Sequence, residues 1–245
     1  MGAWREGVDG RERPDGVERM AGMRAGAAAR VKLCGVRTPR DAAVVAAAGA
    51  DFMGVILSPG YFRSVVPAEA LAVYEAARAR RVGVFVDAPA EVVARTARAL
   101  ELDVVQLGGA ETVETVAEVG RAGAWAVWKT IHAKPGVSMA KAAAPYAAAA
   151  DGILVDAWNP AQPGGTGHTF AWDAVGAEVR RAIGSASFIA AGGMTPDNAG
   201  AAIAALGPDV LDVSSGVEST PGLKDPGRTR AFVEAVRRAC AGGQQ

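Results

Sequence analysis

The chain has 245 residues, half of them hydrophobic, and its 26 basic residues are balanced by 26 acidic ones. A chain of this length can bury one sizeable core, and a net charge of zero gives no basic surface for nucleic acid or for an anionic membrane. No apolar run reaches the roughly 18 residues that a membrane-spanning helix needs, so we expect neither membrane nor nucleic acid as a partner. The two cysteines, Cys34 and Cys240, lie near opposite ends, which favours a reducing, cytoplasmic compartment over a disulfide framework.

The first 30 residues differ in composition from the rest of the chain. They are polar, rich in Gly and Arg, and show no helical or strand periodicity. They also lack the apolar centre of a secretory signal. We therefore expect a disordered N-terminal extension over residues 1–30 and one folded domain over residues 31–241.

From residue 31 onward, short apolar runs alternate with alanine-rich stretches of helical spacing. The runs predict eight strands, over residues 31–35, 52–57, 81–86, 103–108, 125–130, 152–156, 187–192 and 209–215. Thr195 and Pro196 are predicted as the N-cap and first residue of the helix after the seventh strand. Gly49, Gly123 and Gly207 stand where helices are expected to end.

This alternation predicts an α/β fold with a parallel sheet. Eight complete units indicate a single closed (β/α)8 barrel, the TIM barrel, of the smaller size class. A doubly wound open sheet is the alternative that the pattern alone leaves open. In a closed barrel the chemistry lies at the carboxyl ends of the strands, so the residues that end the strands are the candidates for a site.

Three glycine-rich segments follow the last three predicted strands. Loops of this kind, rich in backbone N–H groups, are typical phosphate sites after strands seven and eight of such barrels. The simpler alternative is that these glycines only make tight turns. The predicted phosphate-binding residues are Gly165, Gly167, Gly192, Gly193, Ser214, Ser215 and Gly216.

Cys34 and Asp156 end the first and sixth predicted strands. Residues two apart on a strand share a face, so Lys32 is expected beside Cys34, where an ammonium favours the thiolate and makes it a usable base. Lys32 would itself need a partner, and Asp212 on the neighbouring eighth strand is the candidate. A carboxyl beside apolar residues could keep its proton and act as an acid. Alternatively, Cys34 is a small core residue and Asp156 a helix cap or loop anchor.

The stretches KLCGVRTPRDA, GILVDAWNPAQPGGTGHTFAW and DVSSGVESTPGLKDP occur in this order along the predicted barrel. With them the chain resembles the phosphoribosylanthranilate isomerase family of tryptophan biosynthesis. The resemblance implies an Amadori rearrangement of N-(5-phosphoribosyl)anthranilate to 1-(o-carboxyphenylamino)-1-deoxyribulose 5-phosphate, without cofactor or metal. It assigns the general base to Cys34, the general acid to Asp156 and the anthranilate carboxylate to Arg63. Asp212 and the glycine-rich loops would contact the substrate.

One position departs from the family pattern. The fourth strand of the family usually ends Gln-Leu-His-Gly, whereas here Gly108 stands in place of the histidine. A paralogue that acts on a related phosphoribosyl-amine in a specialised pathway therefore stays open, as does a non-catalytic barrel that binds a phosphorylated ligand. The presence of Cys34, Asp156 and Arg63 together favours an enzyme. Both a monomer and a homodimer are compatible with the sequence.

Overall fold

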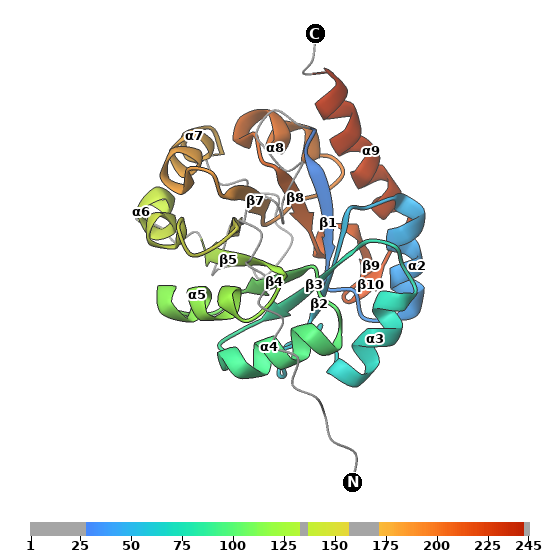
Figure 1. The fold of residues 1–245 in the computed structure, drawn as a ribbon. Coiled ribbons are helices and arrows are strands. Elements are labelled where there is room, and N and C mark those ends of the chain that lie inside the picture. The colour runs from blue at the N-terminus through green and yellow to red at the C-terminus, as the bar shows by residue number, and fades with distance from the viewer. Residues whose placement is uncertain (1–27, 133–136, 157–171, 243–245) are drawn as a thin grey trace.

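The structure, a computed structural model, describes residues 28–132, 137–156 and 172–242. Within them, eight parallel strands close into one barrel in sequence order, so that β1 (Arg30–Cys34) pairs with both β2 (Phe52–Ile56) and β8 (Val210–Val213) (Figure 1). The intervening strands are β3 (Arg80–Phe85), β4 (Val104–Leu107), β5 (Ala126–His132), β6 (Gly152–Asp156) and β7 (Ser187–Ala191). The closed barrel is confirmed and the open sheet is excluded. The expected extension over residues 1–30 lies almost wholly outside the described residues.

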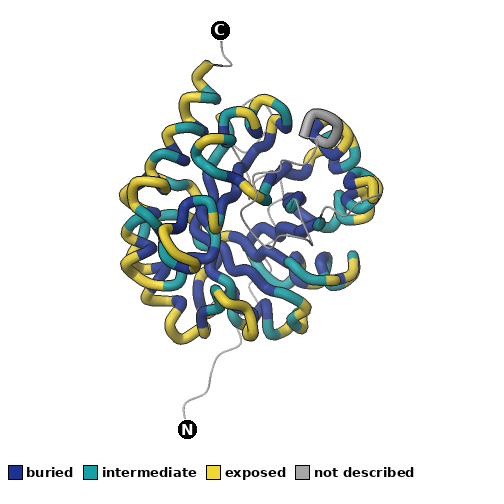
Figure 2. Tube along the Cα trace, turned by 180° about the vertical axis from the view of Figure 1, so that it is seen from behind, coloured by how far each residue is buried: buried dark blue, intermediate teal, exposed yellow. Residues whose placement is uncertain are grey.

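Helices surround the barrel and connect its strands. They are α2 (Pro39–Ala48), α3 (Pro67–Glu75), α4 (Ala90–Ala99), α5 (Val113–Arg121), α6 (Met139–Ala143), α7 (Trp172–Ile183), α8 (Ala199–Leu206) and α9 (Pro226–Gly242). Between β8 and α9 the chain forms a short 3-10 turn, η2 (Ser215–Val217), and a two-stranded hairpin, β9 (Glu218–Thr220) and β10 (Leu223–Lys224). Seen from behind, the strands are buried and the exposed residues lie on the outer helices (Figure 2). None of the described helices combines the length and apolarity needed to cross a membrane.

The helix ends follow local chemistry, with one correction. Gly49 and Gly207 adopt left-handed backbone conformations as the C-caps of α2 and α8, as predicted. The predicted start of α8 at Thr195 is wrong, because the N-cap is Asn198. The backbone N–H of Thr195 donates to Asn198 Oδ1 at 2.8 Å, and that of Asn198 donates to Thr195 Oγ1 at 3.3 Å. Thr195 therefore belongs to the turn before α8 and does not cap the helix.

The barrel interior is filled by a layer of side chains that forms the floor of the mouth. It consists of Phe52, Val82, Val104, Ala126, Trp128, Leu154, Ile189 and Val210. Phe52 and Trp128 meet edge to face, with ring centroids 5.1 Å apart. Because side chains alternate along a strand, residues two and four positions further along face the mouth above this floor.

Candidate active site

Lys32 and Cys34 both point into the barrel from β1, above the glycine of β2. A Cβ atom built on Gly54 would lie 3.1 Å from Cys34 Sγ and 3.2 Å from Lys32 Nζ. Both functional atoms therefore occupy the space that a larger residue at position 54 would fill. Sequence reasoning missed Gly54, although a glycine inside a strand is a known sign of close approach.

Lys32 and Asp212 form an ion pair inside the barrel. Lys32 Nζ lies 2.9 Å from Asp212 Oδ2, and the lysine side chain has no exposed surface. This is the partner that strand parity and barrel closure predict. Burial alone would lower the pKa of Lys32, but the charge of Asp212 and the contact with Cys34 outweigh it, so the pKa is raised. The ammonium thus stays charged beside the thiol.

Asp156 ends β6, and His132 stands directly beside it at the end of β5. His132 Nδ1 lies 3.7 Å from Asp156 Oδ2, and both side chains are partly exposed at the mouth. The enclosure of the carboxyl raises the pKa of Asp156, against the opposing charges of His132 and Lys32. The carboxyl therefore holds its proton to higher pH than an ordinary aspartate does. The sequence missed His132 because the apolar run of the fifth strand ends at residue 130, two residues before the strand does.

Arg63 lies in the loop after β2 and is held by Glu218 of β9. Its Nε donates to Glu218 Oε1 at 2.9 Å and its Nη2 to Oε2 at 2.7 Å, while Lys224 Nζ donates to Oε1 at 3.0 Å. Burial opposes ionisation of Glu218, but the bonds from Arg63, the Gly222 N–H and Lys224 lower its pKa to about 2. Sequence reasoning did not identify Glu218.

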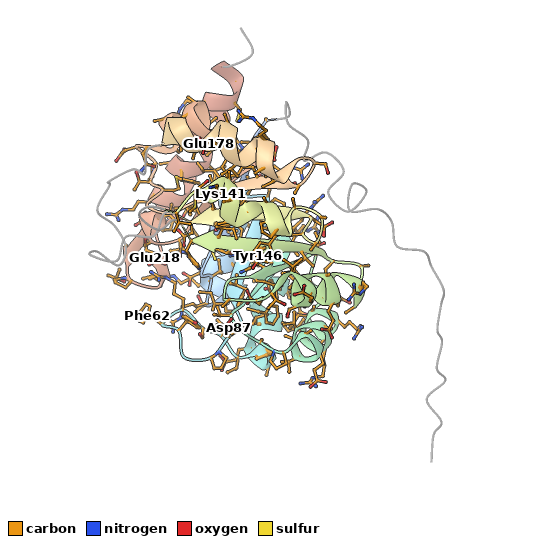
Figure 3. All side chains as sticks on the ribbon, turned by 90° about the vertical axis from the view of Figure 1, so that its left-hand side faces the viewer. Phe62, Asp87, Lys141, Tyr146, Glu178 and Glu218 are labelled. Carbon is orange, nitrogen blue, oxygen red and sulfur yellow. The ribbon has the colours of Figure 1, made fainter. Side chains whose placement is uncertain are left out.

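Arg63 reaches the end of β1. A Cβ atom on Gly35, the residue after Cys34, would meet Arg63 Cδ at 2.5 Å and Ser214 Oγ at 3.0 Å. Figure 3 shows Phe62, the neighbour of Arg63, and Glu218 at the same end of the molecule. The guanidinium, the thiol and the loop after β8 therefore meet at one edge of the mouth.

The loops after β7 and β8 touch each other. Gly192 and Gly193 have φ angles of 94° and 63°. A Cβ atom on Gly216 would lie only 1.8 Å from the carbonyl oxygen of Met194, so glycine is required where the two loops meet. The predicted Gly192, Gly193, Ser214, Ser215 and Gly216 are thus parts of two adjoining loops. Gly165 and Gly167 lie outside the described residues.

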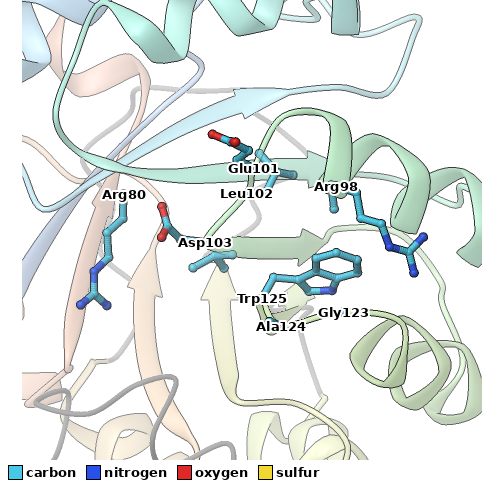
Figure 4. A pocket seen from close by; sticks show the side chains of 10 residues that line it. Arg80, Arg98, Glu101, Leu102, Asp103, Gly123, Ala124 and Trp125 are labelled. Carbon is cyan, nitrogen blue, oxygen red and sulfur yellow. The ribbon is translucent and has the colours of Figure 1, made fainter. Parts of the chain in front are cut away.

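A hollow of about 570 Å³ opens at the end of the barrel away from the predicted site, where β3, β4 and β5 begin (Figure 4). Arg80, Asp103 and Trp125 line it, together with Arg98 over the indole ring. It contains none of the predicted site residues. Within the described residues, no group of three or more His, Cys, Asp or Glu side chains could hold a metal ion.

Comparisons with known proteins point to one family. The sequence profile of the family described as "N-(5'phosphoribosyl)anthranilate (PRA) isomerase" matches residues 31–235. A protein of that name from Chromohalobacter salexigens is 40% identical over 209 residues, which are 84% of this chain and 93% of the relative. The crystal structure of phosphoribosyl anthranilate isomerase from Thermotoga maritima superposes with a TM-score of 0.76 at 31% identity, covering 86% of this chain and 99% of that one. A solved complex of such an enzyme with reduced 1-(o-carboxyphenylamino)-1-deoxyribulose 5-phosphate gives a TM-score of 0.74 at 29% identity, covering 86% and 99%.

Proposed function

The chain belongs to the N-(5'-phosphoribosyl)anthranilate isomerase family, and on that premise we propose that its barrel mouth performs the Amadori rearrangement of this phosphosugar amine in tryptophan biosynthesis. We assign the roles of base and acid from the different surroundings of Cys34 and Asp156 at the mouth. The thiol of Cys34 lies beside the buried, charged Lys32, whereas Asp156 has a raised pKa, which favours a protonated acid. A base and an acid are the two groups that this isomerisation needs.

The reaction proceeds in two proton transfers. Asp156 gives its proton to the ring oxygen of the ribose, and the bond between that oxygen and C1 breaks to leave a Schiff base with the aryl amine. The thiolate of Cys34 then removes the proton from C2, which gives an enolamine. Tautomerisation of the enolamine to the C2 ketone completes the isomerisation, with no net gain or loss of protons. Neither step calls for a cofactor or a metal ion.

Substrate binding would use the groups around this pair. Glu218 occupies the Nε and Nη2 edge of Arg63, which leaves the Nη1 end to meet the anthranilate carboxylate. The adjoining loops after β7 and β8, with Gly192, Gly193 and the Ser214–Gly216 segment, would take the phosphate through their N–H groups. Asp212 would act from beneath the substrate through its pairing with Lys32.

The test is turnover of phosphoribosylanthranilate by the purified protein, followed as loss of anthranilate fluorescence. Cys34→Ser and Asp156→Asn are each expected to lower kcat at least about a hundredfold, the lower range for removal of a general acid or base. Cys240→Ser is the matched control, because Cys240 lies on α9, away from the mouth, where it packs against the core and accepts a hydrogen bond from the N–H of Ala29. A near-normal rate in either mouth variant would remove that residue from the mechanism.

One observation favours a modified substrate as the second candidate. A Cβ atom at Gly108 would meet only ordinary contacts, the nearest at 3.5 Å, so the backbone there would accept a side chain and the family histidine is missing for no steric reason at Cβ. A paralogue could use the missing imidazole to accept a different aryl amine. Normal turnover of the anthranilate substrate, unchanged in Gly108→His, would exclude it. Binding of phosphorylated ligands without turnover would instead indicate a non-catalytic barrel.

We also propose a cytoplasmic location, in keeping with two free thiols.

A further inference from the structure

The mouth contains a histidine that neither the sequence motifs nor the mechanism above uses. His132 is the last residue of β5, and its Cα is in register with that of Asp156 on β6. His132 Nε2 lies 3.1 Å from the carbonyl oxygen of Gly108 on the other side. The imidazole therefore bridges the ends of β4 and β6, in front of the acid.

The partners of this ring fix which nitrogen carries a proton. A carbonyl oxygen only accepts, so Nε2 must be the donor to Gly108. In a neutral ring Nδ1 then has a lone pair, and this atom is buried with no hydrogen-bond partner among the described residues. It lies 3.7 Å from Asp156 Oδ2, so the two acceptors face each other. They attract only if one proton lies between them, on either the carboxyl or the ring.

We propose that His132 is a positioning residue that shares one proton with Asp156 and keeps the acid loaded at neutral pH. The proposal deepens the proposed isomerase function and rests on it. The pair holds one proton, either as carboxylic acid and neutral imidazole or as carboxylate and imidazolium. When Asp156 gives its proton to the ribose ring oxygen, the partly exposed imidazole lets water return one. The proton that Cys34 takes up balances this over a full turnover.

The surroundings of the pair suit this role. The charged groups that face Asp156 from other strands are Lys32 of β1 and Asp212 of β8, and these are paired with each other at 2.9 Å. On β5, the strand of His132, Lys129 Nζ is paired with Glu111 Oε2 at 2.9 Å. Each of these ionic groups thus has a counter-ion of its own, so among the described residues His132 is the unpaired titratable neighbour of Asp156.

The anchor of the ring is rigid. Lys129 Nζ is buried and donates to the carbonyl oxygen of Gly109 at 2.7 Å, next to the carbonyl that His132 holds. Glu111 in turn accepts from the N–H of Gly109 at 3.0 Å. Hydrogen bonds to the N–H and the carbonyl oxygen of Gly109 therefore hold the loop after β4 in place. This loop in turn orients the imidazole through the carbonyl oxygen of Gly108.

The first experiment compares pH profiles of kcat/KM for the wild type, His132→Gln and His132→Asn. The glutamine keeps a donor for Gly108 and the asparagine keeps a polar group toward Asp156, but neither can hold the shared proton. Both are expected to shift the alkaline limb about one unit or more to lower pH and to lower kcat about tenfold at pH 7.5, with KM changed less than twofold. Lys141→Gln, an exposed residue of α6, is the control for a changed charge and should leave the profile unmoved. An unshifted limb in both histidine variants would overturn the proposal.

The second experiment does not depend on turnover. The chain has two histidines, so the imidazole nitrogens give a simple 15N spectrum in the intact protein. At neutral pH the Nδ1 shift of His132 is expected between the protonated and unprotonated limits, and Asp156→Asn should move it to the unprotonated limit. If the Nδ1 shift of His132 is the same in the wild type and in Asp156→Asn, the shared proton is refuted, even if the enzyme is active. A shared proton in a protein that fails to turn over phosphoribosylanthranilate would refute the proposed function instead.

Discussion

The hydrogen bonds of Glu218 make a contribution to the free energy of unfolding that can be measured. Its carboxylate accepts hydrogen bonds from Arg63 and Lys224, and its pKa falls from the usual 4.5 to about 2. A fall of that size corresponds to at most about 3 kcal/mol of stability. Solvent reaches the guanidinium of Arg63, whose side chain is 24% exposed, so we expect about 1–3 kcal/mol.

The sign follows from a pKa that is lower in the folded state. The contribution is fully present above the unfolded value near 4.5 and is lost as pH falls through about 2. Urea unfolding of the wild type and Glu218→Gln should therefore differ by about 1–3 kcal/mol at pH 6, and the two curves should converge toward pH 2.5. Glu234→Gln is the control, because Glu234 makes only an exposed 3.8 Å contact with Arg238 and should show a small, flat difference. A gap between wild type and Glu218→Gln that stays constant down to pH 2.5 would refute the reasoning.

Further variants test the ion pair beneath the mouth and the contact between its loops, with a control on α8. Lys32→Met should cost about 3–5 kcal/mol in urea unfolding, because it leaves Asp212 as a buried unpaired charge, and Lys32→Met/Asp212→Leu should recover most of that loss. Gly216→Ala should raise KM for the phosphosugar about tenfold or more, since its Cβ would lie 1.8 Å from Met194 O and force the two loops apart; an unchanged KM would contradict the loop contact. Gly200→Ala, on α8 where a Cβ meets nothing within 4 Å, should leave KM unchanged and stabilise the fold by about 0.5–1 kcal/mol in the same unfolding assay.

The sequence predicts the fold because the barrel repeats one local rule. Each apolar run lies on a strand, and closure makes β1 and β8 neighbours, so the sequence alone predicts Asp212 as the partner of Lys32. The predicted start of α8 is wrong for a local reason. Thr195 and Asn198 can both cap, and the hydrogen bonds between them decide the outcome.

The residues that sequence reasoning missed depend on neighbours from other strands. Gly54 reads as one more residue of an apolar run, and its meaning is visible only when Cys34 and Lys32 are seen in the space above it. Glu218 belongs to a hairpin of short strands, β9 and β10, that carries no periodic signal. His132 follows the apolar run of β5, and its register with Asp156 comes from the pairing of β5 with β6.

A single ion pair beneath the mouth lies near both of the groups that we propose to react. Its cationic end, Lys32, lies beside the thiol of Cys34. Its anionic end, Asp212, and Asp156 repel each other when both are ionised, which disfavours a second negative charge in the mouth. Lys32 also attracts Asp156, but the enclosure of the carboxyl outweighs this and its pKa stays raised. Cys34 and Asp156, on strands separated in the ring by β7 and β8, thus share one ion pair between them, and the raised pKa of Asp156 suits the acid role that we propose for it.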